Sequence, residues 1–244
     1  MAKLFEAIKA HFSFSKLELQ AIAIVAVVLG FVFSFREWGV ERFELSTGLL
    51  NWLTSALITV LVLLVYLSVQ RIVALRIGYK AEFRLSPWAL LAVLAITFIT
   101  RGLVPVAAAG RTLVYHTETR LGRFHYELSY RHLGLLALLG PLAAICLAVL
   151  FKLIGFAAPA NAAIAKTVAI SALFASWNML PLPGLDGMNV LFGSRTLWAF
   201  AFVAIVAASV LLYLFTSVAL ALGAAIIVAA LAAALWFVYL EAGL

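Results

Sequence analysis

Long runs of apolar residues, separated by short polar segments, dominate the pattern along the chain. A transmembrane helix needs about twenty consecutive apolar residues, because the hydrocarbon core of a bilayer is about 30 Å thick. Six runs approach or reach this length: residues 19–35, 49–69, 133–154, 162–180, 196–215 and 218–240. The pattern predicts an all-α polytopic membrane protein in which residues 1–244 form a single membrane domain, with a C-terminal helix pair over residues 193–240.

A seventh apolar segment, residues 88–104, is predicted to be re-entrant or interfacial. Pro105 and the small residues 107–110 follow it and favour a chain that dips into the protein and turns back. Non-helical backbone is tolerated at membrane depth only where protein shields it from lipid. We therefore expect six transmembrane helices rather than seven.

Composition and charge support this topology. With 66% hydrophobic and 11% charged residues, the chain has too little polar surface to cover a water-exposed globule. The net charge of +7 comes from basic residues between the apolar runs, as the positive-inside rule describes, and does not indicate nucleic acid. With a seventh crossing, the 17 basic residues would divide nine to eight between the two sides of the membrane. With six crossings, only four lie on the outer side: Arg36, Arg42, Lys152 and Lys166. Thirteen then lie with both termini, which are predicted to be cytoplasmic.

The N-terminal segment has an amphipathic pattern of its own. Apolar side chains of residues 1–16 fall on one helical face, opposite the lysines, which predicts a short helix lying in the membrane interface. The single cysteine, Cys146, excludes an intrachain disulfide and a cysteine-based metal site.

The segment Asn178-Met-Leu-Pro-Leu-Pro-Gly-Leu-Asp186-Gly187 is the strongest candidate for chemistry. Pro181 and Pro183 are expected to interrupt the helix. The break would let Asp186, the only aspartate in the chain, face the protein interior at membrane depth. The alternative interpretation is a proline-rich turn in which Asp186 caps the next helix.

This segment resembles the Asn-x-x-Pro-x-Pro-x-Leu-Asp-Gly signature of the site-2 protease family of intramembrane zinc metalloproteases. Gly140-Pro141-Leu-Ala-Ala resembles the Gly-Pro start of the preceding helix in that family. The likeness covers about residues 49–192, a protease-like core. It implies that Asp186 occupies the position of the third zinc ligand, and that the segment from Asn178 through its two prolines lies near the substrate.

The family's first motif, His-Glu-x-x-His, is absent. The segment from Arg71 to Gly78 resembles the stretch that usually follows that motif, and counting back places the two ligand histidines at Tyr66 and Gln70. The catalytic base falls at Leu67. Tyrosine and glutamine are poor zinc ligands and leucine cannot accept a proton, so no cofactor is expected. Tyr66 and Gln70 share a helical face and are expected to hydrogen-bond toward Asp186.

The resemblance implies a non-proteolytic pseudoprotease that binds or regulates transmembrane protein clients, with membrane lipid as its other partner. One alternative is an active metalloprotease, with zinc held by Asp186 and loop histidines, and with Glu118 or Glu127 as the base. Its candidate histidine ligands are His116, His125 and His132. A transporter or channel is a second alternative, because a broken helix with one buried acid also suits an ion path.

Overall fold

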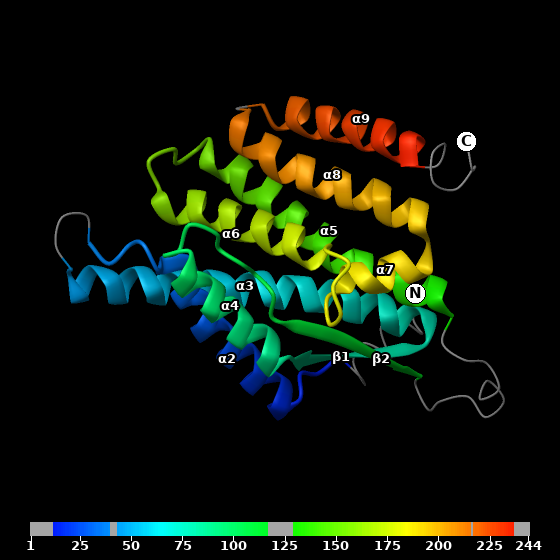
Figure 1. Cartoon of the computed structure of the whole chain (residues 1–244), viewed down its shortest axis with the longest axis horizontal. Coiled ribbons are helices and arrows are strands. Elements are labelled where there is room, and N and C mark those ends of the chain that lie inside the picture. Colours follow the sequence, from blue (N-terminus) through cyan, green and yellow to red (C-terminus); the bar gives the residue numbers. More distant parts are fainter. Residues whose placement is uncertain (1–11, 40–42, 117–128, 216, 237–244) are drawn as a thin grey trace.

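Six long helices pack side by side and give the molecule its long axis (Figure 1). The computed structural model describes residues 12–39, 43–116, 129–215 and 217–236. The predicted interfacial helix of residues 1–16 lies largely outside this part. The six helices are α2 (Lys16–Ser34), α3 (Leu45–Ile77), α5 (Tyr130–Gly155), α6 (Ala162–Asn178), α8 (Arg195–Leu214) and α9 (Val218–Trp236).

These six helices correspond to the six predicted apolar runs. Of the described helices, α2, α3, α5 and α8 are long and apolar enough to cross a membrane. Helix α6 has 17 residues and is shorter, as is the apolar part of α9, Val218–Ala234. The structure is therefore mostly helical, and several of its helices have the length and composition of membrane spans.

A two-stranded antiparallel sheet was not predicted, so the all-α assignment is wrong at this point. It consists of β1 (Tyr79–Leu85) and β2 (Gly110–His116). Gly78 ends α3 in the left-handed conformation, at φ 88°, and so lets the chain turn directly into β1. Within β1, Ala81 and Phe83 are buried at alternate positions, the two-residue period of a strand with one covered face.

The segment between the two strands leaves the sheet and returns to it. Helix α4 (Pro87–Ile99) follows β1, and Leu85 pairs with Gly110 at the start of β2. At the far end of this excursion, the Phe98 ring packs edge-on against Phe35, the C-cap of α2, at 5.3 Å between ring centroids. The excursion therefore reaches the C-terminal end of α2 before the chain returns to the sheet.

The returning chain is held by the last turn of α6. The Trp177 indole donates to the carbonyl of Pro105 at 2.9 Å, and the Asn178 amide donates to that of Ala107 at 3.2 Å. Ala107 itself is fully buried. These bonds satisfy carbonyl groups that would otherwise be unpaired in an apolar interior.

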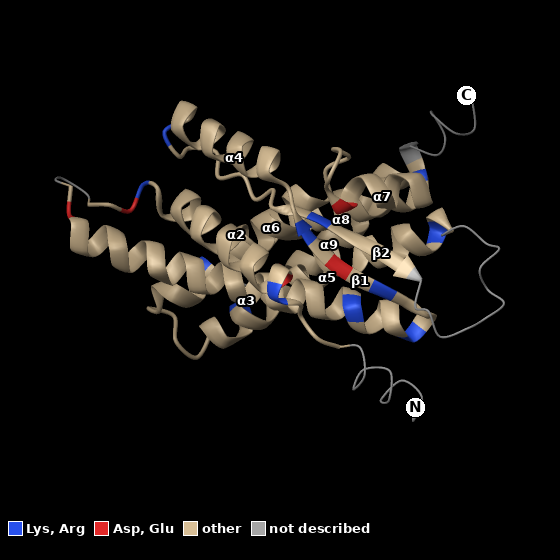
Figure 2. Cartoon of the chain, turned by 90° about the horizontal axis from the view of Figure 1, so that it is seen from below, with Lys and Arg blue, Asp and Glu red and all other residues tan. Residues whose placement is uncertain are grey.

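Charged residues gather at the ends of the bundle, most of them toward the end that carries β1 and β2 (Figure 2). Arg101 was expected on the same side as the basic residues of this sheet end and opposite Arg36, and that grouping is wrong. The next residue, Gly102, lies against Phe35 and Arg36. A Cβ added to Gly102 would be only 2.8 Å from the Phe35 ring. Arg101 therefore lies near the C-terminal end of α2, next to Arg36, and away from the sheet.

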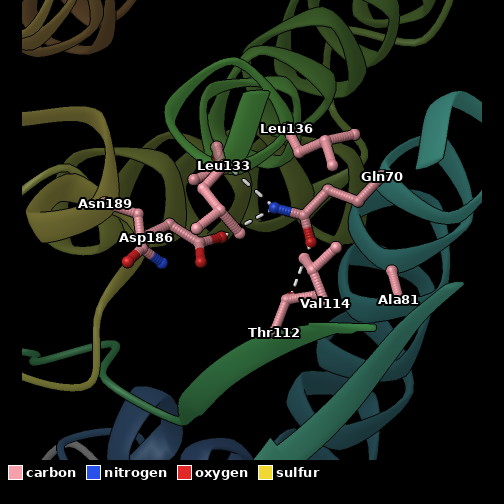
Figure 3. Close-up of a pocket in the computed structure, with 9 residues that line it drawn as sticks. Gln70, Ala81, Thr112, Val114, Leu133, Leu136, Asp186 and Asn189 are labelled. Atoms are coloured by element: carbon pink, nitrogen blue, oxygen red, sulfur yellow. Dashed lines mark hydrogen bonds between the residues drawn. The ribbon is translucent and has the colours of Figure 1, made fainter. Parts of the chain in front are cut away.

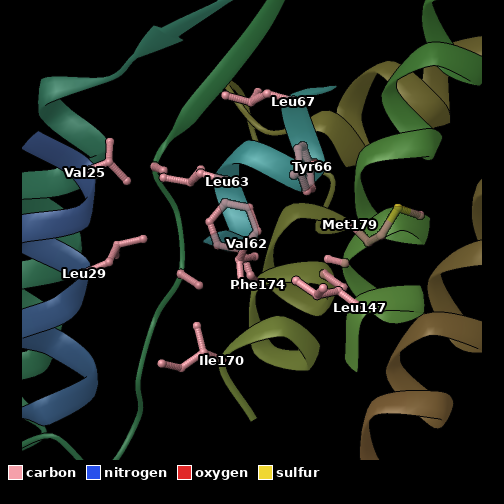
Figure 4. Close-up of a cluster of buried hydrophobic side chains, with 14 of the residues drawn as sticks. Val25, Leu29, Val62, Leu63, Tyr66, Leu67, Leu147, Ile170, Phe174 and Met179 are labelled. Carbon is pink, nitrogen blue, oxygen red and sulfur yellow. The ribbon is translucent and has the colours of Figure 1, made fainter. Parts of the chain in front are cut away.

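The core lies between α2, α3, α5 and α6, and Figure 4 shows apolar side chains from these helices converging there. Small residues bring the helices close together. A Cβ on Gly30 of α2 would lie 2.8 Å from the Cβ of Ala56 on α3. In lipid there is no hydrophobic driving force between helices, so they associate through close packing of their backbones at small residues.

Candidate functional site

The chain interrupts its helical course where the proline pair predicted. Helix α6 ends at Asn178, and the short helix α7 (Asp186–Gly193) begins eight residues later. Gly184 adopts φ +90° in the intervening turn. Leu185, not Asp186, occupies the N-cap position of α7 and makes no side-chain cap bond. The interpretation of Asp186 as a helix cap is therefore wrong.

Asp186 points into the protein and accepts two hydrogen bonds from α3. The Tyr66 hydroxyl donates to Oδ2 of Asp186 at 2.6 Å. The Gln70 amide donates to the same oxygen at 2.7 Å, as Figure 3 shows. Residues four apart share one face of a helix, which is why both side chains reach it. The expected hydrogen bonds toward Asp186 are present.

Gly140 provides the space for this arrangement. A Cβ at residue 140 would lie 2.2 Å from the Tyr66 ring and 2.7 Å from Nε2 of Gln70. Pro141 follows it inside α5 and is also buried. One turn earlier on α5, the carbonyl of Ala137 accepts a second, longer hydrogen bond from Gln70 at 3.3 Å. The Gly-Pro pair thus lies where α5 packs against α3 at the cluster.

Thr112 of β2 completes the cluster, and sequence reasoning missed it. Its hydroxyl donates to Oε1 of Gln70 at 2.7 Å. Because that oxygen accepts from Thr112 while the amide nitrogen donates to Asp186, the orientation of the Gln70 amide is fixed. We call Tyr66, Gln70, Thr112 and Asp186 the Asp186 cluster.

The electrostatics of the Asp186 cluster are those of a carboxyl group removed from water. Asp186 is 3% exposed, and Oδ1 has no hydrogen-bond partner in the described part of the chain. Burial raises the pKa of this carboxyl to about 6, and the hydrogen bonds from Tyr66 and Gln70, together with the backbone N–H of Thr112, act in the opposite direction. No lysine or arginine of the described residues forms an ion pair with it.

The position assigned to the catalytic base carries no acid–base group. Leu67 is 4% exposed and belongs to the apolar core. Asn178, predicted near the substrate, is also buried, and its amide donates to the carbonyls of Ala107 and Phe174. Both of its donor hydrogens are therefore used within the protein. Pro181 and Pro183 lie in the turn before α7, the latter exposed.

The two described histidines of the alternative metal site, His116 and His132, both lie near Tyr79 rather than in the Asp186 cluster. His116 pairs with Tyr79 in the sheet, and the His132 ring lies 6.1 Å from the Tyr79 ring. His116 follows Thr112 by four residues, about 13 Å along a strand. Within the described ranges, no three His, Cys, Asp or Glu residues form a group suited to a metal ion. His125, Glu118 and Glu127 fall outside those ranges.

The described elements therefore define a mostly helical protein with a buried polar site between α3, β2, α5 and α7. The chain matches no model of a protein family, no curated protein and no solved structure. Its site is accordingly interpreted from its own geometry. That geometry offers one buried carboxylate that accepts from two neutral side chains, with Thr112 and Asn189 as further polar neighbours.

Proposed function

We propose that this chain is a site-2-protease-like membrane protein that has lost its metal and binds transmembrane clients without cleaving them. One observation carries the proposal. Tyr66 and Gln70, at the positions that the resemblance assigns to two zinc-binding histidines, both donate to Asp186, at the position assigned to the third ligand. Two residues of α3 and one residue of α7, 116 positions after Gln70, thus converge as a metal site with three protein ligands would require.

The chemistry of these side chains favours a non-proteolytic role. Zinc in such sites is held by imidazole, thiolate or carboxylate groups, and it activates water with the help of a nearby base. The Asp186 cluster supplies one carboxylate, and its phenol and amide hydrogens occupy the oxygen that would bind metal. Leu67 offers no proton acceptor.

The interrupted helix supports a role in client binding. The turn between α6 and α7 carries exposed apolar and proline side chains, among them Leu182 at 49% exposure, beside the buried polar cluster. An extended peptide or the unwound end of a transmembrane segment needs such a site, because its backbone polar groups must be shielded from lipid.

The same proposal includes six membrane crossings with both termini in the cytoplasm. All six long helices then alternate in direction, and the Asp186 cluster lies near the cytoplasmic surface, at the end with more basic residues. The contact between the cluster residues of α3 and α7 supports this topology, because both helices then present them at the same side of the membrane.

Cysteine labelling tests this topology. In a Cys146→Ala background, Ala160→Cys, between α5 and α6, is expected to react with an impermeant maleimide on intact cells. Lys80→Cys, in β1, is expected to react only after the membrane is opened. Both positions are exposed to solvent in the structure. Labelling of both from the same side would contradict the six-crossing arrangement.

Rebuilding the missing motif tests the lost metal. The wild-type protein is expected to carry no stoichiometric zinc after purification, whereas Tyr66→His combined with Leu67→Glu and Gln70→His should bind about one zinc per chain. Elemental analysis measures both. Adding Asp186→Ala to the rebuilt variant should remove the zinc, because it removes the third ligand.

The two possible failures of this experiment have distinct meanings. Zinc bound by the wild type and lost on Asp186→Ala would show that the metal was never lost. A rebuilt variant without zinc would show that α3 and α7 do not have the geometry of the family. Membrane polypeptides that persist with the wild type but are cut in cells carrying the rebuilt variant are the expected clients.

A further inference from the structure

A small cavity lies beside the Asp186 cluster, and its polar lining differs from its surroundings. Its volume is about 10 Å³, which is room for roughly one water-sized occupant. Four polar side chains line it together with apolar groups such as Leu133 and Leu136 (Figure 3). The four are Gln70, Thr112, Asp186 and Asn189.

Two of these polar groups have unused hydrogen-bonding capacity. Gln70 donates to Asp186 and accepts from Thr112, so both of these side chains have partners. By contrast, Oδ1 of Asp186 is buried without a partner in the described structure. Asn189 lies three residues after Asp186 on α7, hence on the same face, and no hydrogen bond of its side chain occurs among the described residues. Figure 3 shows the two side chains next to each other.

The charge of Asp186 is also uncompensated by the described residues. Its Oδ2 accepts from two neutral groups, Tyr66 and Gln70, and no basic side chain of the described chain pairs with it. The first turn of α7 offers only the partial charge of a helix N-terminus. An ionised carboxylate that is buried in this way is costly unless it is paired with a cation.

We propose that this cavity binds one monovalent cation of sodium size, held between Oδ1 of Asp186 and the side-chain oxygen of Asn189. Oxygen donors suit a hard cation, whereas zinc would select nitrogen or sulfur. The space admits one small ion without a hydration shell, and the single carboxylate of the lining balances one positive charge. The proposal concerns the same site as the proposed function but does not depend on clients, so either can fail alone.

Thermal unfolding of the purified chain in detergent at pH 8 tests the site, with sodium chloride compared against choline chloride at equal concentration. A bound ion raises the midpoint as its concentration rises. We expect a rise of about 3 to 5 °C for each tenfold increase in sodium once the site is filled. Choline, too large for the cavity, should give no such rise.

Three variants locate the effect. Asp186→Asn should abolish the difference between the salts, and Asn189→Leu should shift the sodium dependence to higher concentration by about tenfold. Glu82→Gln, which removes a half-buried carboxylate of β1, should leave the difference intact. If Asp186→Asn does not fold, Asn189→Leu still tests the site.

Two results would overturn the inference. Equal midpoints in sodium and choline for the wild type would mean that the cavity holds only water. A sodium effect that survives in both Asp186→Asn and Asn189→Leu would place the ion elsewhere. Neither result bears on zinc binding by the rebuilt variant, so a failed sodium site leaves the proposed function standing.

Discussion

Replacing Arg71 by methionine is expected to lower the free energy of unfolding by about 3 to 5 kcal/mol, because it leaves the Glu18 carboxylate buried without its partner. Arg71 is 3% exposed and Glu18 4%, and the two form an ion pair between α3 and α2. Arg71 also donates to the carbonyl of Ser13 at 2.6 Å, and its guanidinium lies 4.2 Å from the centre of the Phe14 ring.

A matched exposed pair provides the control. Lys80 and Glu82 form an ion pair within β1, but their side chains are 46% and 25% exposed. Lys80→Met is expected to cost less than about 1 kcal/mol, because water screens such a pair. Chemical denaturation in detergent compares the two variants. If Arg71→Met costs no more than Lys80→Met, the buried ion pair does not contribute as the structure indicates.

The double variant Glu18→Gln with Arg71→Met separates the pair from its surroundings. Removing both charges should be less destabilising than Arg71→Met alone, because no unpaired charge then remains buried. A residual cost is expected, since Glu18 also accepts from the backbone N–H groups of Ser15 and Phe83. The ion pair therefore joins the start of α2, the end of α3 and the strand β1.

This junction explains how the sheet reaches the Asp186 cluster. Glu18 holds Phe83 in β1, and Phe83 pairs with Thr112 in β2. Thr112 in turn donates to Gln70, one residue before Arg71 on α3. The ion pair and the Asp186 cluster are thus connected through β1 and β2. Loss of Arg71 is therefore expected to weaken the hydrogen bond from Thr112 to Gln70 as well.

The sequence predicted the parts of this site that depend on local spacing. Tyr66 and Gln70 are four residues apart, so a helix alone places them together. Pro181 and Pro183 cannot continue a helix, so the break before Asp186 also followed from chemistry at those positions. The long apolar runs predicted the helices because their periodicity and length are properties of each segment by itself.

What the sequence did not predict depends on pairing between distant segments. Strands β1 and β2 are seven residues each, and an entire helix separates them, so their partnership leaves no local signal. Thr112 was missed for this reason. Glu18 and Arg71 read as ordinary charges at helix ends, and only the fold shows that they are buried together. Arg101 was misplaced because its side depends on how far the excursion after β1 extends.

Gly140→Ala is expected to lower the free energy of unfolding by about 1 to 3 kcal/mol through overpacking, although alanine is the better helix former. The added Cβ would lie 2.2 Å from the Tyr66 ring. That ring cannot move aside easily, because it is 3% exposed, packs edge-on against Phe174 and donates to Asp186. Displacing it breaks the Asp186 cluster.

Gly223→Ala in α9 is the control, because no atom lies within 4 Å of the Cβ it would add. There the helix preference of alanine acts alone, and a gain of up to about 1 kcal/mol is expected. Both variants are compared with the wild type by chemical denaturation in detergent. Gly140→Ala that is as stable as Gly223→Ala would show that α5 and α3 are not in close contact at the cluster.

A double variant distinguishes the clash from a general effect on α5. Tyr66→Ala alone leaves a cavity and removes a hydrogen bond to Asp186, so it is destabilising by itself. In the Tyr66→Ala background the ring that would clash is already gone, and Gly140→Ala partly fills the space that the ring leaves. The double variant should therefore be more stable than the sum of the two single effects predicts, by more than about 0.5 kcal/mol. Purely additive effects would mean that Gly140 is needed for some feature of α5 other than the close approach of Tyr66.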